Sequence, residues 1–289
     1  SGYASPPVDV LQDTTATQIG VLGDGTQIWK IMHNGVDTHP IHWHMFNLQL
    51  INRVGWDGLL MPPDANELGW KETIRINPLE DTIVAMRPKK AAQPFEVPNS
   101  IRPIDPTKPI GAPLERGMQG ILTPDMFQTN ALNHMINYGW EYVWHCHILS
   151  HEEMDMMHSM AVAVTPTAPS NLTAADGVTG VDLTWTDNSK NETQFTLQRT
   201  SGGVVTNIVV PSVTGPQTGG VISYTDTTAP AGSAYSYVVL ATNVVGDTFI
   251  YNPAPGARNF PTKTVNSDPA NTAANMVSAV SIVRASVNP

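Results

Sequence analysis

Hydrophobic and polar residues alternate along several short stretches in the first half of the chain. Successive side chains of a β-strand point to opposite faces, so a period of two with one apolar set predicts a strand with one buried face. Phe46, Leu48 and Leu50 alternate in this way with Asn47 and Gln49. The same pattern predicts strands over 73–76, 82–86, 141–147 and 161–164, and no long stretch has the helical period.

The second half repeats this alternation after a short linker. Residues 166–170 read PTAPS, a cluster of turn-favouring residues that predicts a domain boundary. Beyond it, apolar and polar residues alternate over 181–186, 195–198 and 235–239. We therefore predict an all-β chain with two domains, residues 1–165 and 166–289.

A proline-rich segment interrupts the first domain. Prolines stand at positions 88, 94, 98, 103, 106, 109 and 113. Proline cannot donate to a strand ladder, so this region cannot supply central strands. We expect an insertion covering about 88–130, which forms either a long ordered loop or a mobile flap.

Charge and composition narrow the classes of partner. The formal net charge is −10, and the largest basic cluster is the Lys89-Lys90 pair, so a nucleic-acid partner is not expected. No apolar run is long enough to span a bilayer, and the opening residues SGYASPPVDV do not resemble a signal peptide. These features indicate either a cytosolic protein or one whose export signal has been removed. The single cysteine excludes an intrachain disulfide.

That cysteine lies in the stretch YVWHCHILSHEEMDMMHSM, residues 142–160. In a strand, His145 and His147 point to one face and Cys146 to the other, so one strand could serve two metal sites. His151 and Met156 follow at spacings that let a loop bring imidazole and thioether to the thiolate. Two histidines, a cysteine and a weak axial methionine are the ligands of a blue-copper site, which here needs one more histidine.

A second motif, THPIHWHMF at residues 38–46, offers that histidine. His39 differs in parity from His42 and His44, and Pro40 bends the chain between them. His39 can therefore join the face of Cys146, while His42 and His44 join the face of the flanking histidines. The remaining histidines, at positions 33, 134 and 158, lie outside the ligand patterns H-P-x-H-x-H and H-C-H-x₃-H-x₄-M and receive no metal role.

Together the two motifs resemble the last cupredoxin domain of the multicopper oxidases, the family of laccases and cuprous oxidases. The resemblance implies a Greek-key cupredoxin sandwich that binds copper. It implies that His39, Cys146 and His151 bind a type 1 copper with Met156 axial, that His42 binds the type 2 copper, and that His44, His145 and His147 bind the type 3 pair.

In that family, single electrons from a reducing substrate pass from the type 1 copper through the cysteine and its flanking histidines. They reach a trinuclear copper cluster that reduces O₂ to water. The resemblance makes Cys146 and His151 catalytic, with Glu152 as a carboxylate that helps to deliver protons. Ser150 stands where bacterial relatives often have an acid, so the surroundings of the ligands depart from the family pattern.

The second domain resembles a fibronectin type III module, an immunoglobulin-like sandwich. The match covers about residues 167–247 and rests on the core Trp185, the strand with Tyr235 and Tyr237, and a closing Asn-x-x-Gly. Residues 248–271 are expected to be an insertion, with a last strand over 277–283. Such modules are mostly spacers.

The family's trinuclear cluster also needs histidines from a first cupredoxin domain, and this chain has no further pair of such motifs. We therefore expect the C-terminal part of a larger oxidase, inactive without an N-terminal cupredoxin part that lies on another chain or on a removed segment. A blue-copper protein that only binds copper or transfers electrons, and an interaction protein with a degenerate copper domain, are the alternatives.

The substrate is not readable from the motifs, since relatives oxidise phenols, bilirubin and Mn, Fe or Cu ions with the same ligands. A small laccase-type donor is the first expectation and a metal ion the second. By analogy with copper oxidases that carry fibronectin-like modules, we expect a secreted, periplasmic or cell-surface protein.

Overall fold

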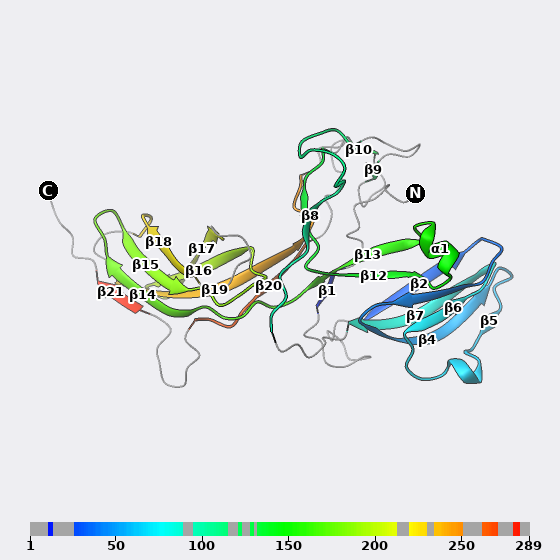
Figure 1. Ribbon diagram of the computed structural model, residues 1–289. Coiled ribbons are helices and arrows are strands. Elements are labelled where there is room, and N and C mark those ends of the chain that lie inside the picture. Colours follow the sequence, from blue (N-terminus) through cyan, green and yellow to red (C-terminus); the bar gives the residue numbers. More distant parts are fainter. Residues whose placement is uncertain are drawn as a thin grey trace. The chain divides into compact units, whose positions relative to one another are not determined.

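The computed structural model describes residues 11–13, 26–88, 95–114, 121–122, 128–129, 132–212, 220–229, 234–250, 262–270 and 280–283 (Figure 1). Strands are by far the main regular structure of these residues, which confirms the predicted all-β class. The helical elements among them are η1 (Ala65–Glu67) and α1 (Leu149–Glu153). No helix in the described part is long and apolar enough to cross a membrane.

The chain divides into two compact units. The first comprises the described residues of Ser1–Gln93, Ser100–Ala163 and Val245–Lys263, and the second those of Pro94–Asn99, Val164–Val244 and Thr264–Pro289. Each unit therefore takes residues from more than one stretch of sequence.

Two sheets form the body of the first unit. One has the strand order β1-β13-β12-β3-β6 and the other β2-β7-β4-β5. The strands of the first sheet are β1 (Leu11–Asp13), β3 (His39–Trp43), β6 (Thr73–Ile76), β12 (Trp140–Cys146) and β13 (Met157–Ala163). Those of the second are β2 (Gln27–His33), β4 (Phe46–Gly55), β5 (Leu60–Met61) and β7 (Glu80–Pro88).

The core of the first unit contains side chains from both sheets. Trp43, Leu48, Val84 and Met160 are fully buried in it, and the thiol of Cys146 is part of the same cluster. These residues come from β3, β4, β7, β13 and β12, so the two sheets share one apolar interior. Burial in this core fixes which face of β12 the cysteine occupies.

Four short strands are described in the proline-rich region and just after it. They are β8 (Ile101–Pro103), β9 (Ile121–Leu122), β10 (Gln128–Thr129) and β11 (Met135–Asn137). Among the described strands, β8 pairs with β11 alone, so Pro103 stands in an edge strand. An edge is where a strand tolerates proline, as expected.

The second unit has two sheets around a separate core. The first sheet contains β14 (Ser170–Asp176), β15 (Val181–Thr186) and β18 (Val221–Asp226). The other is built on β16 (Gln194–Ser201), β17 (Val204–Pro211) and β19 (Ala234–Gly246), and β20 (Thr262–Asn266) and β21 (Val280–Val283) also pair with β19. Residues 248–250 and 262–270 of the expected insertion are described, and β20 lies within it.

The aromatic residues singled out in the sequence lie in this second core. Trp185 is 1% exposed and packs edge-to-face on Phe195, with ring centroids 5.3 Å apart. Tyr235 and Tyr237 are buried in the same cluster. The identity of this sandwich as a fibronectin type III module stays a prediction.

Candidate metal centre

Two adjacent strands and a short helix carry the residues of the two sequence motifs. β3 and β12 are antiparallel neighbours whose register places His145 opposite His42 and Cys146 opposite Ile41. α1 begins directly after β12 and turns the chain back, so that His151 returns to the level of Cys146. Residues that are about a hundred positions apart in sequence thus meet on one sheet.

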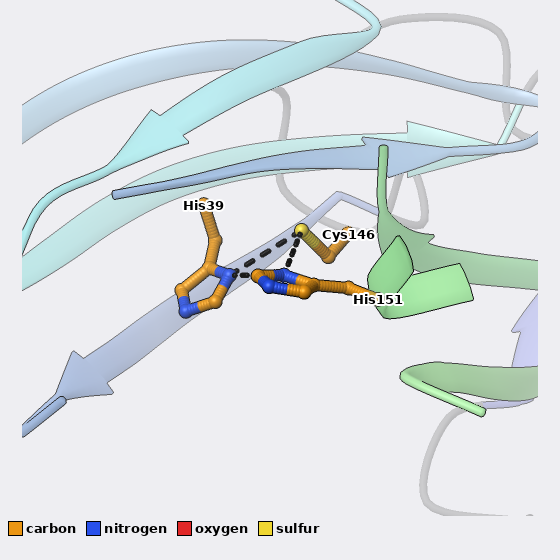
Figure 2. Close-up of side chains that lie close together, drawn as sticks. All are labelled: His39, Cys146 and His151. Atoms are coloured by element: carbon orange, nitrogen blue, oxygen red, sulfur yellow. Dashed lines mark hydrogen bonds between the residues drawn. The ribbon is translucent and has the colours of Figure 1, made fainter. Parts of the chain in front are cut away.

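One set, the thiol group, consists of His39, Cys146 and His151. Figure 2 shows the two imidazole rings and the sulfur turned toward one another. Cys146 Sγ lies 3.3 Å from His39 Nδ1 and 3.4 Å from His151 Nδ1, and the two nitrogens are 3.2 Å apart. The sulfur is fully buried, whereas the rings are half-buried. Burial, together with the neighbouring His33 and His151 rings, lowers the pKa of His39 and so favours the neutral ring that a metal requires.

Met156 is held beside the thiol group by its backbone. Its amide donates to the carbonyl of His151 at 2.9 Å, and its carbonyl accepts from the amide of Cys146 at 3.4 Å. Asp155, with a left-handed φ of 62°, makes the turn between α1 and this contact. The predicted axial ligand is therefore anchored next to two predicted ligands, and its coordination stays a prediction.

A second set, the histidine group, consists of His42, His44 and His145. His44 Nε2 lies 3.3 Å from His145 Nε2, and the ring of His42 lies 5.1 Å from that of His44 and 5.5 Å from that of His145. Burial, followed by the charges of the neighbouring histidines, lowers the pKa of His44. His147 is at the margin, with its ring 5.6 Å from that of His42.

Hydrogen bonds determine which nitrogen is free in two rings of the histidine group, those of His42 and His145. His42 Nδ1 lies 2.9 Å from the carbonyl oxygen of Glu72 and 3.0 Å from Thr73 Oγ1. A carbonyl can only accept, so Nδ1 carries the proton and Nε2 is free to bind a metal. His145 Nδ1 lies 3.1 Å from the carbonyl oxygen of Cys146, which leaves its Nε2 free as well. The thiol group thus offers Nδ1 atoms and the histidine group Nε2 atoms.

Glu152 lies at the edge of the histidine group. Its Oε1 is 3.4 Å from the Nδ1 atoms of both His145 and His147. A carboxylate in this place favours the protonated Nδ1 of each ring, because the N–H points toward negative charge. The geometry therefore joins Glu152 to two predicted ligands.

The donor atoms of both groups fit a transition metal. When three donor atoms bind the same ion at about 2.0–2.3 Å, the donor atoms lie about 3.3–3.8 Å from one another. The thiol group, with separations of 3.2, 3.3 and 3.4 Å, is close to that spacing without a ring having to move far. Thiolate and imidazole together suit copper or zinc, and all-imidazole sets suit copper, zinc, iron or nickel.

A cavity of about 510 Å³ opens beside the histidine group. Its lining includes His42, His44, Glu72 and Tyr142. Met45, with φ 64°, makes the tight turn between β3 and β4 and places His44 at the rim. Small molecules or a further protein segment could therefore reach this face of the group.

Comparison with known proteins finds laccases among the sequences similar to this chain. No protein-family model matches the chain. A laccase of Haloferax volcanii is 28% identical over 193 residues, 65% of this chain and 24% of that laccase. A laccase of Bacillus subtilis is 25% identical over 150 residues, 47% of this chain and 20% of that laccase. The chain contains a laccase-like cupredoxin of the multicopper oxidase type.

The solved structures that match the chain include multicopper oxidases by name. The McoA multicopper oxidase of Aquifex aeolicus matches 53% of this chain and 21% of its own, with 22% identity and a TM-score of 0.29. A multicopper oxidase of Pediococcus acidilactici matches 54% and 21%, with 22% identity and a TM-score of 0.31. The laccase-like chain spans only a quarter or less of its curated relatives.

Sequence reasoning singled out every member of both groups but missed the residues that support them. Glu72 and Thr73 fix the tautomer of His42, and their positions carry no metal-binding signal in the sequence. His33, which was given no role, stacks edge-to-face on His39 at 5.0 Å between centroids. Of the two other unassigned histidines, His134 pairs with Asp247 at 3.0 Å and His158 stacks on Trp144 at 4.9 Å.

Proposed function

We propose that this chain is the C-terminal part of a copper-dependent oxidase of the laccase kind. The thiol group would accept single electrons from a small reducing substrate, and the histidine group would contribute to the centre that reduces O₂ to water. The laccase relatives and the two ligand-like groups in one unit support this proposal.

One observation carries the proposal: the two groups are joined by a single peptide bond. Cys146 belongs to the thiol group and its neighbour His145 to the histidine group, on opposite faces of β12. An electron that leaves the thiolate therefore has to cross only one residue to reach an imidazole of the other group. A protein that needed only one metal site would have no use for this arrangement.

Each residue then has a role as a ligand or as its support. His39 Nδ1, His151 Nδ1 and Cys146 Sγ would hold one copper, with Met156 as a further, weaker ligand. His42, His44, His145 and His147 would hold part of a copper cluster. Bound copper would supply one-electron redox chemistry at the first site and oxygen reduction at the second.

Glu152 would hold a proton near the second site. Its Oε1 lies within 3.4 Å of two of the proposed ligands, so a proton on this carboxyl is close to where oxygen would be reduced. The buried core around Cys146 excludes water from the sulfur, so the sulfur would be available to the metal and not to solvent.

The histidine group alone is an incomplete cluster. His44 is exposed, and the cavity beside it leaves room for further ligands. We infer that an N-terminal cupredoxin part, on another chain or on a preceding segment, supplies them. For the reducing substrate, a small organic donor of the laccase type is our first proposal, with a metal ion as the second.

Copper stoichiometry with visible and electron-spin spectra of the Cu(II)-treated chain tests the proposal. We expect about one tightly bound copper per chain with an intense thiolate band, because the thiol group is the one full ligand set in the described part of the chain. Cys146→Ser should remove both the band and the tight copper. His158→Ser, which changes a histidine outside both groups, is the matched control and should leave both unchanged.

Two results would contradict the proposal. The first is a chain that is folded yet binds no copper and shows no thiolate band. For the second, the copper-loaded chain is mixed with an N-terminal cupredoxin part of a related laccase, with a phenol or Cu(I) as electron donor. An unaltered spectrum and no oxygen consumption would favour a simple blue-copper electron-transfer protein.

A further inference from the structure

His33 lies directly behind the thiol group, at the end of β2. Its ring stands at 67° to that of His39, with centroids 5.0 Å apart. His39 Nδ1 faces Cys146 Sγ, so any rotation of the His39 ring moves a proposed ligand atom. His33 is therefore in contact with a ligand without belonging to the thiol group itself.

The loop after β2 fastens the His33 ring at both nitrogens. His33 Nε2 donates to the carbonyl of Asp37 at 2.6 Å, and His33 Nδ1 accepts from the amide of Gly35 at 3.3 Å. One nitrogen donates and the other accepts, so these bonds select a single neutral tautomer. The backbone carbonyl of His33 also accepts from the amide of Leu79 at 2.8 Å, which ties this end of β2 to the segment before β7.

Gly35 is required for this arrangement. A Cβ at this position would lie 2.6 Å from His33 Cε1, closer than side-chain carbons approach in proteins. The loop can close over the ring only without a side chain here. We call the segment from His33 to His39 the His33 brace, because its loop closes over the His33 ring at Gly35 and holds that ring against His39.

We propose that His33 is a positioning residue that sets the orientation of the His39 ring in the copper site. This inference rests on the proposed function, since it assumes that the thiol group binds copper. Groups that support a metal ligand hold its ring at the angle for coordination, and their loss typically weakens metal affinity by about 10–100-fold. The His33 brace does so through ring packing instead of through a hydrogen bond to the ligand.

The test compares three variants of the full chain, loaded with Cu(II). His33→Phe keeps a ring but loses both hydrogen bonds, and Gly35→Ala displaces the His33 ring without removing it. His158→Phe is the control, because it also replaces a histidine that stacks on an aromatic ring but lies away from His39. Far-ultraviolet circular dichroism and thermal melting first establish that each variant is folded.

We expect both His33→Phe and Gly35→Ala to shift the thiolate band and the reduction potential and to weaken Cu(II) affinity about 10–100-fold, while His158→Phe matches the unchanged protein. If the two variants only melt earlier, with spectrum, potential and affinity unaltered, His33 is merely structural and the inference is overturned. If the unchanged chain shows no thiolate band at all, the proposed function fails, and this inference fails with it.

Discussion

Arg53 is a charged residue inside the first unit, only 4% exposed. Its guanidinium donates to both carboxylate oxygens of Glu67, at 2.6 and 2.7 Å, and to the carbonyl of Arg75 at 2.8 Å. Its Nε also lies 3.1 Å from Glu80 Oε1. Removing one partner of such a buried charge strongly destabilises the folded protein, because the charge is then left without compensation. The bidentate pair joins η1 to β4.

The pKa of Glu67 leads to a prediction for acid stability. The hydrogen bonds from Arg53 lower this pKa from its ordinary value of 4.5 to about 2. A lowered carboxyl pKa gives stability that is present above pH 4.5 and is lost as the pH falls toward 2. We expect Glu67→Gln to reduce the free energy of unfolding at pH 7 by about 2–3 kcal/mol.

Urea denaturation followed by tryptophan fluorescence between pH 2 and 7 measures this effect. The difference between Glu67→Gln and the unchanged protein should shrink between pH 4.5 and 2, where Glu67 becomes protonated. Glu153→Gln, at an exposed position, should track the unchanged protein throughout. A constant difference at every pH would mean that packing, and not charge, is what Glu67 contributes.

The residues of the proposed copper sites could be found from sequence because strand geometry constrains them. Alternation alone assigns Cys146 and His145 to opposite faces of one strand, and the structure places them in separate groups. The supporting residues could not be found, because they act through ring packing and backbone carbonyls. Nothing in the letters around His33 or Glu72 indicates that a ligand ring lies against them.

Among the secondary-structure elements, the predicted strands were those with one polar and one apolar face. Strands predicted over 73–76 and 181–186 are confirmed with the same bounds as β6 and β15. The strand predicted over 277–283 is found at Val280–Val283, and residues 277–279 lie outside the described part. β2 was not predicted, because its outward positions include Ile28 and Met32, which are 61% and 67% exposed. Apolar residues on both faces hide the period of two.

A single asparagine orders the proline-rich segment after β8. Asn133 is 1% exposed, and its Nδ2 donates to the carbonyls of Asp105 and Lys108 at 2.9 and 2.7 Å. Its Oδ1 accepts from the amide of Asp105 at 3.0 Å, and its backbone carbonyl accepts from the amide of Gly111 at 2.7 Å. One side chain thus satisfies three backbone groups of a loop that lacks a ladder of its own.

Asn133→Ala should therefore release this loop. The loss of three hydrogen bonds of about 0.5–1.5 kcal/mol each predicts a cost of about 2–4 kcal/mol. We expect faster hydrogen exchange over residues 104–112, with little change in β6 or β7. The exposed Asn66→Ala serves as the control. Unchanged protection of the loop in Asn133→Ala would show that the prolines alone maintain it.

At the scale of the whole molecule, two buried glutamates, one in each unit, lie in opposite environments. Glu67 in the first unit is paired, whereas Glu192 in the second is fully buried with its Oε2 lacking a hydrogen-bond partner among the described residues. Burial, followed by the charge of Asp187, raises the pKa of Glu192 to about 7. Its other oxygen accepts from Ser212 Oγ at 3.0 Å.

This difference predicts opposite responses to pH. A carboxyl with a raised pKa keeps its proton in the folded state up to about pH 7, whereas in the unfolded state it ionises near pH 4.5. The free energy of unfolding therefore falls as the pH rises from about 4.5 to about 7. Glu192→Gln, which is neutral at every pH, should stabilise the second unit at pH 7.5 by about 2–3 kcal/mol relative to the unchanged protein. At pH 4.5 the two should be nearly equal.

Urea denaturation at both pH values, with hydrogen exchange of β16 to follow the second unit, measures this response. Asp176→Asn, at an exposed position of the same unit, should have no such pH dependence. Equal stability of Glu192→Gln and the unchanged protein at pH 7.5 would mean that Glu192 is ionised in the fold at little cost.

The division of the chain into units has a consequence for how the protein can be taken apart. The first unit includes residues of Val245–Lys263, and the second includes Pro94–Asn99. A single cut after Ala163 would therefore deprive each fragment of a stretch that belongs to it. Exchanging the second sandwich for another domain therefore requires three separate stretches of sequence to be replaced. A proteolytic cut at the linker would leave each fragment with residues that belong to the other unit, so the cut need not separate the two fragments.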